Sequence, residues 1–441
     1  MKDIIAAIAT PRGKGGVAIV RISGEGSVSL ASKLFSPWSA PKPRYMYYGQ
    51  MLYGTTVVDK GLAVWFEKGR SFTGEETVEL HCHGGERVTS LMLEAAIEAG
   101  ARPAEAGEFT KRAFLNGMID LSGAEAVGDM IEADSKAAVL QAGRALSGGL
   151  GSKISGFQQK ITDMLASIEA SIDYPDEVSE QYTRESIAES ISELKAELEE
   201  LIATYKHGRV RKEGISVCIM GRPNAGKSSL LNRLCGRERA IVTTIEGTTR
   251  DVLHETVEMG SVAVHLYDTA GLRQSDDCIE RIGMDMAREQ ARIADLVLYL
   301  VDASCGIQPD DEQELQGIRE LGVKCQRVFN KCDLSGSVDC SEGDICISAK
   351  SGEGVDKLRE RIISCAGSDT DTIAIASLRH LQALKGASLA LTDAYSAAED
   401  MPLDCVAIDL HRCWDELGQI TGQTVNEDII SRIFEKFCVG K

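Results

Sequence analysis

The residues best suited to chemistry lie in the segment GRPNAGKSSLLN, which begins at Gly221. Four residues separate Gly221 from Gly226, and Lys227 and Ser228 follow directly. An apolar run before the segment indicates a buried strand and the pattern after it indicates a helix, which is the setting of a phosphate-binding loop. In such a loop, backbone N–H groups and the positive end of the helix dipole face phosphate oxygens. We expect Lys227 to reach the β- and γ-phosphates of a nucleotide and Ser228 to ligate Mg²⁺.

A second motif, VFNKCD, indicates which base is bound. It carries Asn330, Lys331 and Asp333 at the end of an expected strand. The Asp333 carboxylate can accept two hydrogen bonds from the N1–H and exocyclic amine of guanine, a pattern that adenine does not offer. The segment 348–350 follows a short strand and is expected to complete the base pocket through backbone groups. Together the motifs predict a domain that binds GTP rather than ATP.

Two segments between these motifs indicate the switch regions. In LYDTAGL, Asp268 ends an apolar strand and is expected to hold the Mg²⁺ shell, while the Gly271 N–H can sense a γ-phosphate. In TTIEGTTRD, Thr249 is the candidate that reaches Mg²⁺ when the γ-phosphate is present. Leu272 stands where a Ras-like GTPase carries the glutamine that orients water, so hydrolysis needs another water-orienting group and another positive charge. The predicted GTP-binding residues are Asn224, Ala225, Gly226, Lys227, Ser228, Ser229, Thr243, Thr244, Ile245, Glu246, Gly247, Thr248, Thr249, Asp268, Thr269, Ala270, Gly271, Asn330, Lys331, Asp333, Ser348, Ala349 and Lys350, with Ser228 and Thr249 as the Mg²⁺ ligands.

The elements that must position these residues fall into zones along the 441 residues, a length typical of about two or three domains. Residues 1–118 are β-rich, 119–213 are helical, 214–366 alternate strands with helices, and 367–441 are helical again. The alternation predicts a mainly parallel sheet with helices on both faces. The fold class is therefore multidomain α/β: a β-rich N-terminal α+β domain, and a helical domain into which a Ras-like P-loop G domain is inserted. A core stripe is predicted from residues at three- and four-residue spacing, namely Ile187, Ile191, Leu194, Leu198, Leu201, Ile202 and Tyr205.

Composition narrows the setting of the protein. The net charge of −19 is unlike the basic field of a typical nucleic-acid binder, so any RNA contact needs local basic patches or a partner. Lys111-Arg112 and the stretch 209–212 are such patches, and both are more typical of solvated faces. Thirteen cysteines at irregular spacing without an export signal indicate reduced thiols and a cytoplasmic location, and no apolar run is long enough to span a membrane. His81-Cys82-His83 has no second pair at metal-binding spacing, so no metal site is expected there.

Motifs along the whole chain make a family resemblance visible. They are ATPRGKGGVAIVRISG, SFTGEETVELHCHGG, GEFTKRAFLNG, DYPDE, GRPNAGKSS, GTTRD, DTAGLR, IERIG and the terminal FCVGK. The chain resembles the TrmE/MnmE family of tRNA-modification GTPases over its full length. The resemblance implies a constitutive homodimer that pairs with an FAD-dependent enzyme of the GidA/MnmG type in a heterotetramer. The complex would install an aminomethyl or carboxymethylaminomethyl group at C5 of the wobble uridine of certain tRNAs.

The resemblance also implies a site for a tetrahydrofolate one-carbon carrier, a 5-formyl or 5,10-methylene derivative, in the N-terminal domain. Its residues carry over to Arg21, Glu79 and the terminal Lys441, and Cys438 carries over as the cysteine of the family's tail. Met118 departs from the pattern, because the family usually has a lysine in the stretch that reads NGMIDL here. This chain therefore has one cation fewer for the carboxylates of the carrier, unless Lys111 or another residue compensates.

For hydrolysis, the resemblance implies K⁺ activation and face-to-face pairing of G domains. The K⁺ ligands would be Asn224, Thr243, Ile245 and Thr248. Potassium can stabilise developing phosphate charge as an arginine finger would. Glu280 would help to orient water, and Arg250 and Arg273 are the matching switch residues.

Two other functions fit parts of the sequence. A ribosome-assembly GTPase of the Era/EngA kind would have the same G-domain motifs, but it would carry an RNA-binding KH-like module, and the helical C-terminal segment has no GXXG loop in such a setting. A folate-dependent binding module with a GTPase acting only as a silent timer is the alternative from another class. Analysis of tRNA nucleosides with and without a hydrolysis-dead variant separates these functions.

Overall fold

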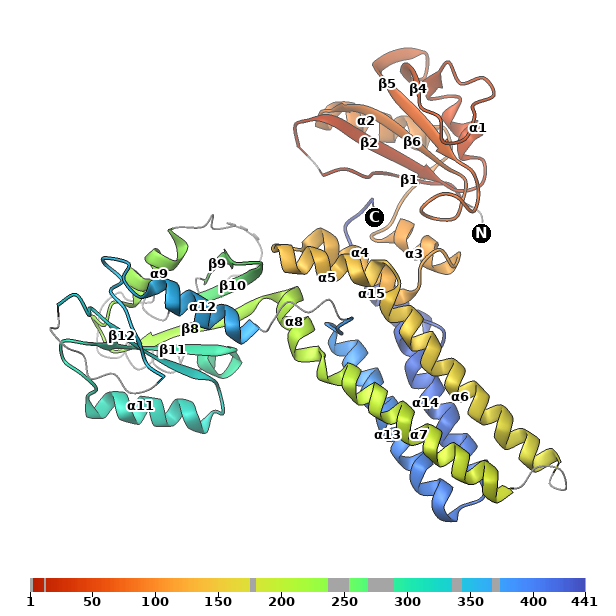
Figure 1. Ribbon diagram of the computed structural model, residues 1–441. Helices are drawn as coiled ribbons and strands as arrows, with labels where there is room; N and C mark the ends of the chain where they lie inside the picture. Colours follow the sequence, from red (N-terminus) through yellow and green to blue (C-terminus); the bar gives the residue numbers. More distant parts are fainter. Residues whose placement is uncertain are drawn as a thin grey trace. The chain divides into compact units, whose positions relative to one another are not determined.

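The computed structural model describes residues 3–11, 13–174, 180–236, 254–268, 289–334, 343–366 and 373–440. It divides into two compact units, each described by itself below. One comprises Met1–Gly128, Ala145–Leu198 and Gln382–Lys441, and the other comprises Asp129–Arg144 and Glu199–Leu381. Two mixed sheets and a set of long helices confirm the predicted multidomain α/β fold class (Figure 1).

The first unit contains a mixed, mostly antiparallel sheet of seven strands in the order β3-β4-β5-β6-β2-β1-β7. The strands are β1 Ile5–Ile8, β2 Gly15–Ser23, β3 Phe35–Ser36, β4 Tyr47–Tyr53, β5 Thr56–Phe66, β6 Thr77–Gly84 and β7 Arg102–Pro103. Helices α1 Ser27–Ala31 and α2 Glu86–Glu98 accompany it. Val20, Leu80 and the α2 residue Met92 are fully buried together in one core. Because side chains alternate along a strand, Arg21 and Glu79 lie on the sheet face opposite this core.

Helices make up the remainder of the first unit and run on into the second. Their bounds are α3 Glu108–Leu115, α4 Leu121–Glu132, α5 Lys136–Leu146, α6 Gly149–Asp173, α7 Glu180–Ala203, α8 Tyr205–Glu213, α13 Leu378–Asp400, α14 Leu403–Thr421 and α15 Glu427–Phe434. The predicted core stripe on α7 is confirmed at five positions, each at most 2% exposed, namely Ile187, Ile191, Leu194, Leu198 and Leu201. Ile202 and Tyr205 are only half-buried.

The second unit contains a six-stranded sheet in the order β13-β12-β11-β8-β10-β9. The strands are β8 Ile215–Gly221, β9 His254–Met259, β10 Val262–Asp268, β11 Leu296–Asp302, β12 Cys325–Asn330 and β13 Ile345–Cys346. All neighbouring pairs are parallel except β9 with β10, which confirms the mainly parallel sheet. The helices that pack on it include α9 Lys227–Cys235, α11 Pro309–Glu320 and α12 Val355–Ala366.

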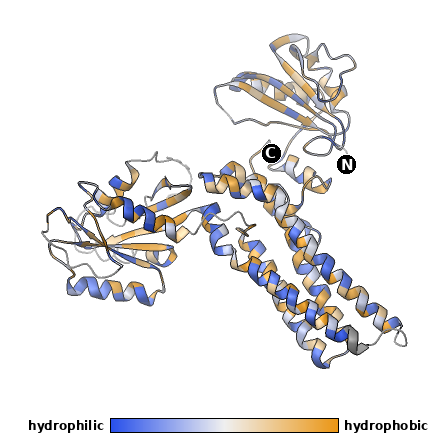
Figure 2. Cartoon of the chain, in the orientation of Figure 1, coloured by the Kyte–Doolittle hydropathy of each residue, from blue (hydrophilic) through white to orange (hydrophobic). Residues whose placement is uncertain are grey.

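Strand β11 shows why helices cover both faces of this sheet. Its residues Leu296, Leu298 and Leu300 belong to a core with α9 and α12, whereas the alternate residues Val297, Tyr299 and Val301 belong to a core with α11. All six are nearly fully buried, and the central strands are hydrophobic along their length (Figure 2). A strand buried on both faces is typical of parallel sheets, and it fixes the carboxyl ends of β8, β11 and β12 at one edge.

The cysteines correct one prediction. Ten cysteines of the described residues are free thiols, but Cys346 in β13 is disulfide-bonded, so the prediction of reduced thiols throughout is wrong at that position. None of the described helices is both long enough and apolar enough to cross a membrane.

Candidate functional site

The phosphate loop follows β8 and depends on two glycines. Gly221 has φ 136°, and a Cβ there would lie 2.3 Å from the Leu300 carbonyl oxygen. Gly226 has φ 98° and precedes α9, and a Cβ there would lie 2.1 Å from Asn330 Nδ2. Only glycine fits positions with both a positive φ and such close neighbours. Asn224, between them, is exposed and also has a positive φ of 62°.

Lys227 is the first residue of α9 and is buried beneath the loop. Its Nζ donates hydrogen bonds to the carbonyl oxygens of Gly221 at 2.7 Å and Arg222 at 2.8 Å. Ser228 follows in the first turn of the helix. An ammonium and a helix N-terminus within one loop give the positive field that attracts phosphate. The geometry therefore matches the predicted phosphate loop around these residues.

Asn330 brings the base motif to the phosphate loop. Its side chain is buried at the end of β12, where Nδ2 donates to the Ala225 carbonyl oxygen at 2.8 Å. Its Oδ1 accepts the Ala349 N–H at 2.9 Å. One amide therefore joins the phosphate loop to the 348–350 loop, and the structure brings these three predicted segments together. Asp333 follows three residues later, in the turn after β12.

Lys331 has a partner that sequence reasoning missed. Its Nζ lies 2.6 Å from Asp302 Oδ2, at the end of β11, and Ser304 donates to Asp302 Oδ1. Burial opposes ionisation of Asp302, but the hydrogen bonds from Lys331 and Ser304 outweigh it and hold its pKa below the ordinary value. The signal in the sequence was an acid at the end of the apolar run LVLYLVD, the same pattern that singled out Asp268.

Several predicted nucleotide residues lie outside the described residues. They are Thr243, Thr244, Ile245, Glu246, Gly247, Thr248, Thr249, Arg250, Thr269, Ala270, Gly271, Arg273 and Glu280, together with the side chain of Asp268. Their roles stay predictions from the sequence.

A second cluster lies on the face of the N-terminal sheet opposite the α2 core. Arg21 and Glu79 are register partners on β2 and β6, and Arg21 Nε lies 2.9 Å from Glu79 Oε1. The Arg21 guanidinium carbon also lies 5.8 Å and 5.5 Å from the ring centres of Phe72 and Phe109. Burial opposes ionisation of Glu79, but nearby His81 and the charge of Arg21 hold its pKa below the ordinary value. The structure therefore brings together two of the four residues that the resemblance implied for folate.

The chain's C-terminal tail and Met118 lie in the same unit. The tail is held by a bridge between Ala106 and Val439, and Gly440 packs against the carbonyl oxygen of Ile8. Ile8 follows Ala7, the register partner of Arg21. Cys438 is exposed, and Lys441 lies outside the described residues. Met118 is 40% exposed, and a Cβ at Gly74 would lie 2.9 Å from its Cγ, so it packs beside the loop that leads to β6.

Comparisons with known proteins show which family the chain belongs to. Residues 4–118 match the family model described as GTP-binding protein TrmE N-terminus, and residues 121–438 match the MnmE helical domain. The chain is 41% identical to the tRNA modification GTPase MnmE of Symbiobacterium thermophilum and 42% identical to that of Carboxydothermus hydrogenoformans, with each pair covered over its full length. The chain belongs to the MnmE family. The predicted family is therefore confirmed.

Among solved structures, the chain is similar to Era of Aquifex aeolicus. That likeness covers 40% of this chain and 66% of Era, with 27% identity and a TM-score of 0.30. A likeness at this TM-score carries no weight for function. The family assignment depends on the family models and on the full-length relatives.

The sequence contains two basic patches, Lys111-Arg112 and the stretch 209–212, which were interpreted as solvated faces. The structure corrects that interpretation. Arg112 is an ion-pair partner of Asp3, Glu75 and Glu108. Its side chain is only 12% exposed. Because its charge is paired and its side chain is largely buried, Arg112 can attract a phosphate only weakly.

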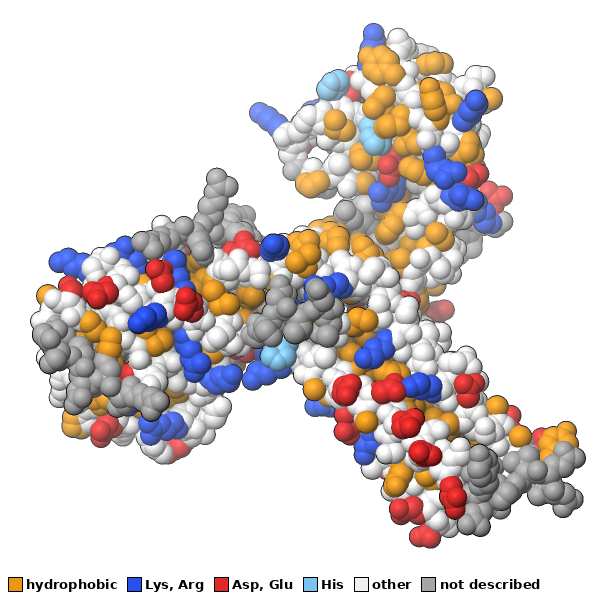
Figure 3. Space-filling view, in the orientation of Figure 1, with side chains coloured by type: hydrophobic (Ala, Val, Ile, Leu, Met, Phe, Trp, Pro, Cys, Tyr) orange, Lys and Arg blue, Asp and Glu red, His pale blue; other side chains and the backbone are white. Residues whose placement is uncertain are grey.

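The basic residues of the second patch, 209–212, are likewise buried or paired. Arg211 is 5% exposed, so it is not a solvated charge. Arg209 forms an ion pair with Asp295, and Lys212 lies 2.8 Å from Asp129. Figure 3 also shows acidic side chains gathered on the visible side of α7, where Glu185, Glu189 and Glu193 are exposed. The described residues of the two basic patches therefore offer little free positive charge to RNA phosphates.

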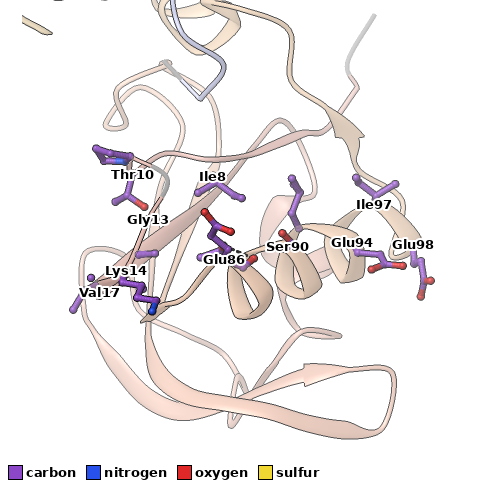
Figure 4. Close-up of a pocket in the computed structure, with 16 residues that line it drawn as sticks. Ile8, Thr10, Gly13, Lys14, Val17, Glu86, Ser90, Glu94, Ile97 and Glu98 are labelled. Carbon is purple, nitrogen blue, oxygen red and sulfur yellow. Dashed lines mark hydrogen bonds between the residues drawn. The ribbon is translucent and has the colours of Figure 1, made fainter. Parts of the chain in front are cut away.

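A groove of about 850 Å³ lies between the β1–β2 loop and α2, with Thr10 and Lys14 on one side and Glu86 and Glu94 on the other (Figure 4). Sequence reasoning did not find it, because its two walls come from segments far apart in the chain, residues 8–18 and 84–98. Three glutamates, including Glu98, face one lysine among its lining residues. This charge balance disfavours a phosphate or the glutamate tail of a folate, and neither Arg21 nor Glu79 lines the groove.

The lowered pKa of Glu79 predicts how stability depends on pH. Its folded pKa lies below the unfolded value of about 4.3, so its ion pair contributes stability above that pH and loses it as the pH falls through the folded pKa. Glu79→Gln should therefore destabilise the protein at about pH 7, and the difference should shrink towards about pH 3.

Urea unfolding at several pH values, followed by circular dichroism, measures this difference. The exposed Glu86 on α2 provides the control, because Glu86→Gln should change stability little at any pH. A Glu79→Gln difference that stays constant across the acid range contradicts the ion-pair account.

Proposed function

We propose that this chain is a K⁺-stimulated GTPase whose nucleotide cycle drives modification of the wobble uridine of certain tRNAs. The product is a 5-aminomethyl or 5-carboxymethylaminomethyl uridine, its one-carbon unit comes from a tetrahydrofolate derivative, and an FAD-dependent GidA/MnmG-type enzyme is the partner. Membership of the MnmE family supports the GTPase and the tRNA substrate. The observation that carries the nucleotide part is the Asn330 amide, which joins the phosphate loop to the 348–350 loop.

In the nucleotide site, each group has a proposed task. Lys227 and the N–H groups of the loop before α9 bind the β- and γ-phosphates, which neutralises charge that grows during phosphoryl transfer. Ser228 and Thr249 ligate Mg²⁺. Asp333 reads the base, and the 348–350 backbone closes the pocket around it. The fit of Ser228 to Mg²⁺ rests on its place in the first turn of α9, directly after Lys227.

The missing glutamine at Leu272 is the reason to include K⁺. A bound K⁺ supplies positive charge next to the phosphates. Asn224 fits as a ligand because it is exposed in the loop before α9. Its positive φ places it in the loop conformation and not in the helix that follows. Thr243, Ile245 and Thr248 complete the proposed ligand set. Glu280 orients water, and Arg250 and Arg273 act as switch residues.

The Arg21–Glu79 cluster fits a reduced folate. Glu79 can accept from the amino and N–H groups of a pterin edge, while Arg21 lies among the rings of Phe72 and Phe109. His81 Nε2 is buried and lies 3.4 Å from Glu79 Oε2, so it belongs to the same polar cluster that a pterin edge would contact. Lys441 provides the remaining cation, and Cys438 of the exposed tail acts in the one-carbon step.

We propose the domain limits 1–118 for folate binding and dimerisation, 119–213 and 367–441 for the helical domain, and 214–366 for the inserted G domain. A homodimer joins the GidA/MnmG-type enzyme in a heterotetramer. The tRNA substrate supports a cytoplasmic location.

Asp333→Asn tests the nucleotide site. An amide cannot accept both guanine hydrogen bonds, so affinity for GTP should fall by roughly 10- to 100-fold, equal to about 1.5–3 kcal/mol for a charged hydrogen bond. Xanthosine triphosphate should bind better than before, because its C2 oxygen suits an amide donor. Fluorescent-nucleotide titration of parent and variant measures both constants. Unchanged affinity and selectivity would refute the assignment of Asp333.

Asn224→Ala tests the cation. GTP hydrolysis by the parent should be much faster in K⁺ than in Na⁺, since the smaller ion fits the same oxygen cage poorly. The variant should lose that stimulation while it still binds GTP, because Lys227 and the loop N–H groups remain. Steady-state phosphate release in matched KCl and NaCl measures the rates. Equal rates of the parent in both salts would remove K⁺ from the mechanism but leave the GTPase.

Met118→Lys tests the folate site. A lysine should tighten binding of 5-formyltetrahydrofolate by roughly three- to tenfold, a modest gain because solvent at this 40% exposed position screens the new charge. Glu79→Ala should abolish binding. Titration calorimetry on the intact protein decides the matter. If the parent does not bind at all, the folate role is wrong for this chain, and if Met118→Lys changes nothing, another cation already serves the carboxylates.

A further inference from the structure

Arg233 connects the helix after the phosphate loop to the loop proposed to contact the base. It lies on α9, six residues after Lys227, and its side chain is half-buried. Its Nε donates to the Ala349 carbonyl oxygen at 2.9 Å, and its terminal nitrogen donates to the Lys350 carbonyl oxygen. A guanidinium presents several donors in a fixed plane, so it can hold two successive carbonyls at once.

The Ala349 peptide groups are consequently held from two sides. The N–H of Ala349 donates to Asn330 Oδ1, and its carbonyl accepts from Arg233. Ser348 is fully buried, and its Oγ accepts the Ser351 N–H at 3.1 Å, which closes the turn from within. The 348–350 loop is therefore fixed to the phosphate-loop side of the domain by two side chains from different elements.

We propose that Arg233 is a positioning residue for guanine selectivity, which rests on the proposed base pocket at Asp333 and the 348–350 loop. It does not touch the nucleotide. It sets the distance between the phosphate loop and the 348–350 backbone, which in this proposal contacts the 6-oxo edge of the base. Without the Arg233 side chain, Asn330 alone holds the 348–350 loop. The contact between this loop and the 6-oxo edge weakens, while the phosphate loop still binds the phosphates.

The test compares two nucleotides that both keep the N1–H and the 2-amino group proposed to contact Asp333. GTP carries oxygen at position 6, and 6-thioguanosine triphosphate carries sulfur there, a weaker hydrogen-bond acceptor, so their affinity ratio reports the contact with the 348–350 loop. The parent should prefer GTP. Arg233→Ala should weaken GTP by about tenfold, equal to about 1.4 kcal/mol, and should weaken the 6-thio nucleotide less, so the ratio falls. A general loss of stability would weaken both nucleotides together.

Arg359 provides the matched control. It lies on α12, and its terminal nitrogen donates to the Leu234 carbonyl oxygen at 3.1 Å, so it holds the same helix α9 without touching the 348–350 loop. Arg359→Ala should leave the affinity ratio at the parent value. Arg233→Lys keeps a charged donor and should restore part of the ratio, which also covers the case in which Arg233→Ala does not fold.

The outcomes separate the two claims. A parent that does not discriminate between the nucleotides contradicts the base pocket and the role of Arg233 with it. A discriminating parent whose ratio is unchanged in Arg233→Ala, or in Arg233→Lys where the alanine variant is unfolded, overturns the role of Arg233 and leaves the pocket standing.

Discussion

The nucleotide edge of the second unit depends on one buried side-chain amide. Asn330 donates to Ala225 in the phosphate loop and accepts from Ala349 in the 348–350 loop. Strands β12 and β8 are separated by β11 in the sheet, so this amide spans the carboxyl end of a strand between them. Displacing either loop would leave a buried polar group without its hydrogen-bond partner, at a cost of about 1–3 kcal/mol. The positions of the two loops are therefore coupled. The positions of Lys227 and Asp333 follow from that link.

In the N-terminal sheet, an ion pair between neighbouring strands holds the second cluster together. There, strand register places Arg21 opposite Glu79, and the ionic contact between these largely buried side chains favours the charged form of Glu79. A network of ion pairs around Arg112 secures α3 to the same sheet. The chain as a whole is strongly acidic, and the basic patches visible in its sequence are occupied by these internal pairs.

Local patterns predicted a large part of this structure. The glycine spacing before Lys227, the apolar strands and the stripe of α7 depend on residues close in sequence, and each was found where it was expected. Contacts across long separations were missed. Arg112 pairs with Asp3 from 109 residues away, Lys331 pairs with Asp302 and Arg233 holds Ala349, and no periodicity announces such partners. The family resemblance named Arg21 and Glu79 as residues of one site, but their pairing with each other was not predicted, because register is fixed by the whole sheet.

The central claim is that GTP turnover by this chain drives uridine modification. Its most direct test is mass-spectrometric nucleoside analysis of tRNA from a strain that lacks its own MnmE-family protein and carries this chain or its Lys227→Ala variant. Lys227 lies within the phosphate loop, so its loss removes nucleotide chemistry while the N-terminal sheet is left intact. The account predicts that the parent restores 5-aminomethyl or 5-carboxymethylaminomethyl uridine and that the variant, present at equal abundance, does not. Equal restoration by both would contradict it.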